Sequence, residues 1–351
     1  MARHVYQDFD DFADGLQGVD GRFVPTARAT GEWWIERVNL GSLVLQQLQI
    51  GGAATFAGDG AEGHASLWIP MTDPRDLRVD GHRLDAGAVL LVRGRQPFTV
   101  SSPRLSRWIN VAFAESMLTD GSLGELTHLL LEQGLGATRI RVQEPFLKRA
   151  QEVVLRHCDD SRPVLVGGHA SAVSTEEVLS ALREALEHAA PIVEKRIGRP
   201  QVSRTEVIAR CLELIDANES QTLFVQDLCA AAQVSERTLR NIFQEYFGVG
   251  PMRLLKVRQL REIRSALLRA DPISGTVTGI AARFGVWDFS LFARNYRALY
   301  GVSPSQTLRG PRTRMHESKS SLGSPPTWIG FAARRFTSRQ AFANARASGE
   351  R

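Results

Sequence analysis

Cysteine is scarce in this sequence, and the few that occur lie far apart. The 351 residues include three cysteines, Cys158, Cys211 and Cys229, and none belongs to a CxxC pair. Disulfide frameworks and structural zinc sites are built from closely spaced cysteines, so neither is expected here. A reducing cytoplasm is the simplest compartment for such a chain.

Long apolar runs are missing too. No segment approaches the roughly 18–20 consecutive apolar residues of a transmembrane helix, and the polar, acidic first residues, MARHVYQDFDDFADG, do not resemble a signal peptide. With 43% hydrophobic residues, the chain still has enough apolar material for globular cores. We expect a cytoplasmic protein of two domains without a membrane partner.

The short motifs of common catalytic sites are also lacking. GxSxG, the Walker A loop and GxGxxG do not occur in a suitable context. A metal-dependent β-barrel enzyme needs clustered His and carboxylate ligands, whereas His64 and His82 stand alone. The sequence therefore predicts no catalytic residue, no metal ligand and no cofactor. The glycine-rich segment 51–60 is expected to be a hairpin loop rather than a phosphate cradle.

Positive charge is present but unevenly distributed. Residues 1–202 hold 21 Lys/Arg against 26 Asp/Glu, residues 203–310 hold 14 against 10, and residues 311–351 hold 8 against 2. The acidic first part has no electrostatic affinity for phosphate, whereas the basic second part does. The pattern favours a nucleic-acid partner for the second half.

Hydrophobic periodicity divides the chain at a similar place. Strand-like runs occur at 42–50, 66–71, 88–94 and 107–113. They predict a β-sandwich or a β-barrel, and the helical pattern of 122–197, above all a helix over 175–195, predicts flanking helices. We expect this β-rich domain over 1–197, a linker over 198–204, an all-α domain over 205–310, and a basic, mostly disordered tail over 311–351. The fold class is α+β.

A helix-turn-helix unit is predicted early in the all-α domain. In VQDLCAAAQVSERTLRNIFQEYFG, a short helix of small residues is followed by the turn QVS and a second helix with Ser235 as its N-cap. The second helix is expected to bury Leu239, Ile242 and Phe243. In such a unit, the N-terminal part of the second helix enters the major groove of DNA. Its outward polar residues are Arg237, Thr238, Arg240, Asn241 and Gln244.

The same pattern recurs 53 residues later. VTGIAARFGVWDFSLFARNYRALYG again gives a small-residue helix, a turn at Gly285, and a second helix capped by Asp288. Residues 251–269, between the units, predict a helix roughly 28 Å long at 1.5 Å per residue, near the ~34 Å between successive major-groove segments. A repeat with a rigid spacer favours DNA reading over a merely solvated polar face. The apolar stripe of this spacer is predicted at Leu255, Leu260, Ile263 and Leu267.

With these motifs, residues 205–310 resemble the AraC/XylS family of bacterial transcription regulators. The resemblance is carried by VSERTLRNIF, by GVGPMRLL, and by IAARFGVWDFSLFARNYRALYGVSPSQ. It implies two helix-turn-helix units joined by a long helix, with double-stranded DNA as the partner. By position, it also implies which residues face the bases: Arg237, Arg240 and Asn241 in the first unit, and Phe289, Ser290 and Arg294 in the second.

Four supporting positions depart from the usual pattern of the family. Phe224 stands where Ser or Thr usually caps the first helix, and Gly279 costs about 1 kcal/mol of helix preference. Val286 replaces the usual Phe after the turn glycine, and Gln259 replaces the usual Arg of the spacer. These changes concern the support of the recognition helices rather than their outward faces.

The N-terminal half is similar to the subgroup that contains the ethanolamine-operon regulator, which implies a β-rich domain that binds an effector or dimerises. Effector pockets are mostly apolar with a few directed polar groups. The residues that fit this description are Trp34, Trp68, Trp108 and Arg93, with Arg107 as a second possible anion anchor. The helix over 175–195 is a candidate dimer surface, and RNA polymerase is the expected partner of an activator.

Three functions stay open at this point. The first is a sequence-specific transcription regulator controlled by a small-molecule effector. In the second, DNA binding is independent of any ligand, and the N-terminal domain only forms a homodimer. The third, and most remote, is a metal-dependent β-barrel enzyme fused to a DNA-binding module.

Overall fold

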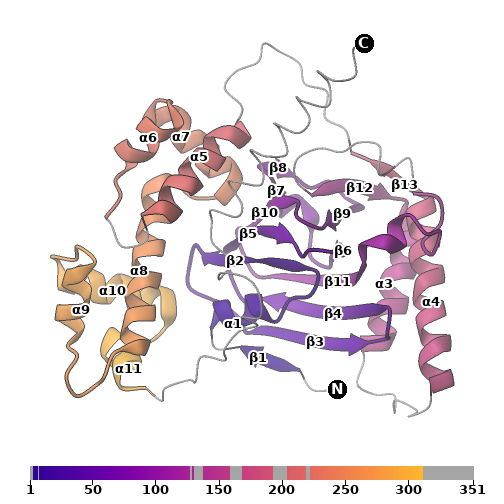
Figure 1. Cartoon of the computed structure of the whole chain (residues 1–351), viewed down its shortest axis with the longest axis horizontal. Helices are drawn as coiled ribbons and strands as arrows, with labels where there is room; N and C mark the ends of the chain where they lie inside the picture. Colours follow the sequence, from indigo (N-terminus) through magenta and orange to yellow (C-terminus); the bar gives the residue numbers. More distant parts are fainter. Residues whose placement is uncertain are drawn as a thin grey trace.

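Two antiparallel sheets that face one another form the first half of the protein. The computed structural model describes residues 3–6, 8–126, 129, 137–158, 168–192, 204–218 and 222–310. The expected linker, except for Arg204, and the expected tail lie outside these residues. Over the described strands, the two sheets form a sandwich and do not close into a barrel (Figure 1).

The large sheet has eight strands and the small sheet five. In spatial order, the large sheet comprises β1 (His4–Tyr6), β3 (Trp33–Asn39), β4 (Leu43–Ile50), β11 (Ser106–Ala114), β6 (His64–Pro70), β9 (Ala88–Arg93), β12 (Thr138–Val142) and β13 (Ala189–Pro191). The small sheet comprises β2 (Val19–Pro25), β5 (Ala54–Gly60), β10 (Pro97–Ser102), β7 (Arg78–Val79) and β8 (His82–Arg83).

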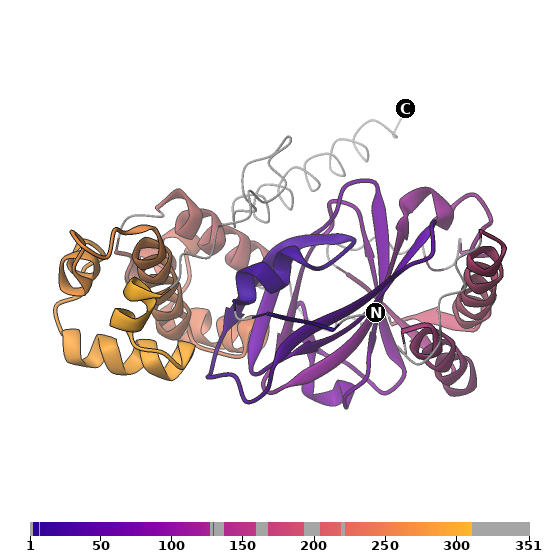
Figure 2. The ribbon, with the colours of Figure 1, turned by 90° about the horizontal axis from the view of Figure 1, so that it is seen from below.

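Alternation along the strands gives each sheet two different faces. On β11, Trp108 belongs to the core between the sheets, whereas its neighbour Ile109 belongs to a second core on the outer face of the large sheet. Two helices cover that outer face, α3 (Glu144–Cys158) and α4 (Gly168–Glu187) (Figure 2). The hydroxyl of Thr175 on α4 donates a 2.8 Å hydrogen bond to the Leu40 carbonyl.

The sequence prediction for this half needs two corrections. Segment 51–60 is not a hairpin loop, because Ala54–Gly60 forms β5 between β2 and β10. The region 122–197 is not helical throughout, since β12 and β13 join the large sheet, and the helix predicted over 175–195 ends at Glu187. In both places, pairing with strands distant in sequence overrides the local pattern.

The second half is a row of helices. In chain order, they are α5 (Arg204–Ala217), α6 (Val225–Ala232), α7 (Glu236–Phe247), α8 (Pro251–Arg269), α9 (Val277–Arg283), α10 (Phe289–Tyr300) and α11 (Pro304–Arg309). Helices α5–α7 share one apolar core, and α9–α11 share another. The long helix α8 contributes Leu254 to the first core and Leu260 to the second. The stripe of α8 differs from the prediction, because Leu254 and Val257 are buried and Leu255 is only half-buried.

The small sheet lies between the large sheet and the helical half (Figure 2). Val24 of β2 belongs to the core of the second helical unit, and Tyr300 of α10 packs on the core of the sandwich. The Thr55 hydroxyl on β5 donates a 2.9 Å hydrogen bond to the Phe247 carbonyl at the end of α7. Among the described helices, none is both long and apolar enough to cross a membrane.

Candidate nucleic-acid interface

The first helix-turn-helix unit consists of α6 and α7. The backbone N–H of Phe224, at the start of α6, donates to the Asp227 carboxylate over 2.7 Å, so Asp227 supports the helix end where the usual Ser or Thr is missing. The chain turns at Gln233, whose φ of 55° is left-handed. Ser235 then caps α7 by accepting the N–H of Thr238. This N-cap is the one predicted from the sequence.

The face of α7 that points away from its core is polar and exposed. Leu239, Ile242 and Phe243 are buried as predicted. Within the described residues, no hydrogen bond or ion pair engages the side chains of Arg237 and Asn241. The exposed residues of this face are Arg237, Thr238, Arg240, Asn241 and Gln244.

The other three polar residues of this face already have partners. Arg240 forms a 2.7 Å ion pair with Glu236 one turn earlier, and both side chains are more than half exposed. The Thr238 hydroxyl lies 2.9 Å from that of Ser235. Gln244 donates to the Gly248 carbonyl over 2.7 Å and so closes the C-terminal end of α7. Arg237 and Asn241 are therefore the groups most available to a ligand.

The second unit repeats this construction with α9 and α10. Thr276 caps α9 by accepting the N–H of Gly279, which places the unusual glycine in the first turn, where its cost to the helix is lower. Gly285 makes the turn with φ of 73°. Asp288 caps α10 by accepting the N–H of Leu291 over 2.8 Å. Phe289, Ser290 and Arg294 are all exposed.

The spacer α8 is fastened to both units. Near its middle, Arg258 pairs with Glu262 and donates over 2.7 Å to the carbonyl of Asn218, which directly follows α5, the helix that shares an apolar core with the first unit. The next residue, Gln259, donates to the Phe284 carbonyl at the end of α9 over 2.6 Å. The Gln that replaces the usual Arg thus holds the second unit in place. Adjacent residues of one rigid helix set the orientation of both units.

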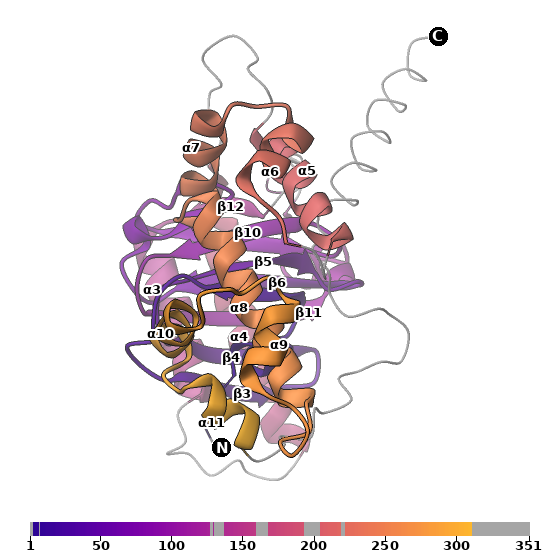
Figure 3. The same ribbon diagram turned by 90° about the vertical axis from the view of Figure 1, so that its left-hand side faces the viewer.

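Both recognition helices lie on the same side of the domain. In Figure 3, α7 and α10 are to the left of α6 and α9, along the length of α8. The 19 residues of α8 give it a length of roughly 28 Å. Two helices presented on one side at this scale match the one-turn repeat of the major groove.

The tryptophans predicted to line an effector pocket do not all lie together. Trp68 and Trp108 face the interior of the sandwich, with ring centroids 6.3 Å apart, and each indole N–H donates to a serine two residues earlier. Trp34 belongs to neither apolar core of the sandwich, and the Arg3 guanidinium lies 4.2 Å from the centre of its ring. Arg93 is 3.6 Å from Glu115.

A buried polar group next to these tryptophans was not predicted. Asn110 is fully buried and follows Trp108 at the next inward position of β11. Its amide nitrogen donates to Gln46 and to the Gln17 carbonyl, whereas its amide oxygen has no hydrogen-bond partner within the described residues. The alternation of RWINVAF, with Asn at an inward position, is the sequence signal that would have identified it.

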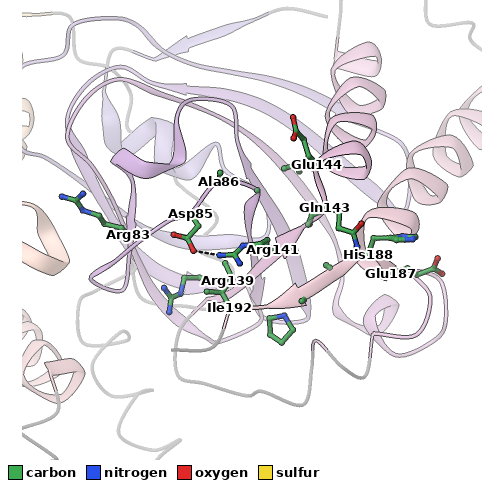
Figure 4. Close-up of a pocket in the computed structure, with 16 residues that line it drawn as sticks. Arg83, Asp85, Ala86, Arg139, Arg141, Gln143, Glu144, Glu187, His188 and Ile192 are labelled. Carbon is green, nitrogen blue, oxygen red and sulfur yellow. Dashed lines mark hydrogen bonds and ion pairs between the residues drawn. The ribbon is translucent and has the colours of Figure 1, made fainter. Parts of the chain in front are cut away.

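An open cavity of about 1160 Å³ lies at the far edge of the large sheet (Figure 4). It is lined by β8, β12, β13 and the start of α3, and Arg141 forms a 2.5 Å ion pair with Asp85 within it. Its lining arginines are matched by an equal number of carboxylates. The charged lining residues are Arg83, Arg139, Arg141, Asp85, Glu144 and Glu187.

The cysteines of the described residues lie in apolar surroundings. Burial raises the pKa of both Cys158 and Cys211 to about 12, so neither forms a reactive thiolate near neutral pH. Over the described residues, no three His, Cys, Asp or Glu side chains are grouped as metal ligands.

The two units and their spacer define a helix-turn-helix domain that is built to bind DNA. Through this domain, the chain belongs to the AraC/XylS family. The family model that matches it, a helix-turn-helix domain, covers residues 228–310.

Named relatives are similar to part of the chain. The probable thc operon regulatory protein of Rhodococcus erythropolis is 35% identical over 139 residues, which are 40% of this chain and 41% of the relative. The XylDLEGF operon transcriptional activator of Pseudomonas putida is 32% identical over 100 residues, which are 28% of this chain and 31% of the relative. The chain thus spans less than half the length of either relative.

Solved structures give two further similarities. A probable AraC family transcriptional regulator from Rhodopseudomonas palustris is 31% identical, with 29% of this chain and 94% of that chain covered at a TM-score of 0.27. ToxT from Vibrio cholerae, in its apo form, is 13% identical, with 76% of this chain and 97% of that chain covered at a TM-score of 0.28.

Proposed function

We propose that this protein is a transcription regulator that reads two successive major-groove segments of double-stranded DNA. The observation that carries the proposal is the position of α7 and α10 on one side of a spacer that packs on the core of the first unit through Leu254 and is bonded to the end of α9 through Gln259. A helix with a merely solvated polar face needs no second copy at a fixed distance. The basic charge of residues 203–310, 14 Lys/Arg against 10 Asp/Glu, supports a phosphate-rich partner.

The reading roles in the first unit follow from side-chain chemistry. Arginine reads guanine N7 and O6 with two hydrogen bonds, and asparagine reads adenine in the same way. Arg237 and Asn241 are assigned these roles, because both are exposed and have no other partner among the described residues. Arg240 is assigned the same role, because its exposed ion pair with Glu236 is weak enough to exchange for DNA. Thr238 and Gln244 are placed beside the phosphates.

The experiment begins with selection of a binding site from random double-stranded DNA by the full chain. Footprinting on the selected site is expected to show protection over two adjacent major-groove segments. Arg237→Ala is expected to relax the preference at one base pair by about 1–3 kcal/mol. Arg149→Ala, on α3 behind the large sheet, is the matched control and is expected to bind as the wild type. An equal loss of affinity on every sequence would exclude base reading by Arg237.

Control by the N-terminal domain is the second part of the proposal. The short helix α1 (Phe9–Asp14) touches both halves of the protein: Phe12 is buried in the core of the sandwich, and Phe9 stacks on Tyr300 of α10 at 5.9 Å. The backbone that follows α1 is held by Gln46 and Asn110 from the large sheet. Asn110 is thus connected through this backbone to the contact of α1 with the DNA-binding half, which is the proposed route of control.

We place the effector in the sandwich interior, next to Trp68, Trp108 and the unpartnered amide oxygen of Asn110. The expected ligand is a small molecule with an apolar body and a hydrogen-bond donor, because a buried acceptor without a partner costs about 1–3 kcal/mol. Thermal-shift measurements on the full chain, with small molecules that combine an apolar body and a hydrogen-bond donor, test this assignment. The expected hit loses its effect in Asn110→Leu.

The alternative function keeps the DNA-binding half but has no effector. In that case, the N-terminal domain serves only to form a homodimer, and α4, which covers the outer face of the large sheet with α3, is the candidate dimer surface. No stabilising metabolite, together with a concentration-dependent dimer that binds the selected DNA, would favour this alternative. Contact of an activator with RNA polymerase belongs to either version and is tested by transcription from the selected site.

A further inference from the structure

Three large apolar side chains are exposed at the N-terminal end of α10. Among the described residues, Trp287 is 85% exposed, Leu291 38% and Phe289 37%. Exposed single apolar residues are ordinary, but three large ones within five positions, one of them a nearly bare tryptophan, mark an interaction surface. We call these three residues the α10 apolar cluster.

The backbone fixes this exposure. Gly285 turns the chain with φ of 73°, Val286 enters the core with 4% of its surface exposed, and Trp287 then points outward. The Asp288 carboxylate accepts the N–H of Leu291 and holds the first turn of α10. The helix buries Phe292 and Tyr296 on its other side, so its own packing does not need the exposed residues.

Cations surround the α10 apolar cluster. Arg294 and Arg297 are exposed further along α10, and Arg283 is exposed at the end of α9. The carboxylate closest in sequence, Asp288, is occupied as the helix cap. An apolar surface bordered by arginines fits a polyanion that also presents methyl groups. The major groove of DNA presents such methyl groups at thymines, beside the phosphates. The charges are the reason to assign this surface to DNA rather than to a partner protein.

We infer that the second unit recognises thymines through the α10 apolar cluster. Phe289 and Leu291 pack on thymine 5-methyl groups in the major groove, as apolar side chains do in direct readout. Trp287, one residue before the helix, lies along the adjacent sugar–phosphate backbone, and its indole N–H donates to a phosphate oxygen. This inference rests on the proposed function, in which α10 enters the groove.

The two units consequently read different chemistry. The outward face of α7 carries hydrogen-bonding groups, whereas the N-terminal end of α10 carries large apolar side chains with Ser290 among them. Loss of a thymine methyl removes packing but no hydrogen bond, so replacement of thymine by deoxyuridine tests the second unit selectively. The half-site of α7 is identified first, as the one whose base preference is relaxed by Arg237→Ala.

The measurement compares the selected site with copies in which the thymines of one half-site are replaced by deoxyuridine. Replacement in the half-site of α10 is expected to weaken binding about fourfold for each buried methyl. The same replacement in the half-site of α7 is expected to have little effect. In Phe289→Ala combined with Leu291→Ala, the loss caused by deoxyuridine is expected to disappear. In Trp287→Ala, the loss of binding caused by deoxyuridine is expected to remain, whereas the affinity falls equally for all sequences.

The outcomes separate the inference from the function on which it rests. If no DNA sequence is enriched, the proposed function fails. If a sequence is enriched but its α10 half-site has no thymine, or tolerates deoxyuridine without loss, the inference is overturned and the proposed function stands. Wild-type affinity of Trp287→Ala and of the double variant would assign the α10 apolar cluster to a protein partner. All three residues are exposed, so the variants are expected to fold.

Discussion

Arg261 of α8 and Asp10 of α1 are 251 residues apart in the sequence, yet they form an ion pair with 2.6 Å between Arg261 Nη2 and Asp10 Oδ1. Beside them, Arg264 pairs with Asp8 over 2.8 Å and stacks on the Tyr300 ring. Two cations of the spacer thus meet two carboxylates of the N-terminal half. This junction is the direct connection between α1 and the helix that orients both recognition units.

The loss of stability caused by Arg261→Ala is expected to depend on pH. Burial raises the pKa of Asp10 above its usual value, and Arg261 opposes that rise. In Arg261→Ala, the pKa of Asp10 in the folded state rises further. Ionised Asp10 therefore destabilises the folded protein more than in the wild type. The cost is absent below the pKa of the unfolded chain and grows as pH rises toward the folded value. Thermal unfolding is expected to show a loss of about 1 kcal/mol near pH 7 and less near pH 4.

The double variant Arg261→Ala with Asp10→Asn is the matched control for this pH dependence. It has no ionisable group at position 10, so the difference in stability from the wild type is expected to be less dependent on pH than in Arg261→Ala. A loss in Arg261→Ala that is equal at both pH values would mean that Asp10 is not the group responsible.

The N-caps of α7 and α10 are each expected to stabilise the folded protein, by similar amounts. Ser235→Ala and Asp288→Ala each remove the acceptor for an N–H in the first turn, at a cost of about 1 kcal/mol each. Circular dichroism during thermal unfolding measures the loss. Asp288→Ser keeps an acceptor at the N-cap and is expected to recover most of it. If Asp288→Ser lowers stability as much as Asp288→Ala does, the carboxylate has a role other than capping.

The helical half was largely predictable from the sequence because its determinants are local. Both N-caps and the buried residues of α7 and α10 follow from spacings of a few positions. β5 was missed because its glycine-rich sequence carries no strand signal of its own, and its partners β2 and β10 are remote. The junction of Arg261 with Asp10 involves no local pattern at all.

The residues predicted to bind an effector illustrate the same limit. Alternation along a strand tells which residues share a face, but not which face is turned toward the other sheet. Trp34 follows Trp33 on β3, and it is Trp33 that enters the core between the sheets. The sequence predicts one pocket lined by three tryptophans, whereas only Trp68 and Trp108 of these three belong to the core between the sheets.

Neutralisation of Glu236 is expected to strengthen DNA binding. Glu236 pairs with Arg240 and places a negative charge at the end of α7 that is proposed to approach phosphates. Glu236→Gln frees Arg240 and removes repulsion, so affinity is expected to rise on all sequences, most at low salt. It also removes a favourable charge from the N-terminus of α7, which costs about 0.3–1 kcal/mol of stability. Titration of labelled DNA at two salt concentrations measures the first effect. Unchanged affinity at low salt would place Glu236 away from the DNA.

The spacer residue Gln259 is expected to control whether both units bind at once. Its amide nitrogen donates to the Phe284 carbonyl, and its amide oxygen accepts from Lys256. Gln259→Leu leaves a half-buried carbonyl without its partner, at a cost of about 1 kcal/mol. The second unit then loses its fixed orientation, and footprinting is expected to show weaker protection of the α10 half-site alone. Met252→Ala, an exposed change on the same helix, is the control and is expected to protect both half-sites. Equal weakening of both half-sites in Gln259→Leu would mean that α8 acts as a whole rather than through this one bond.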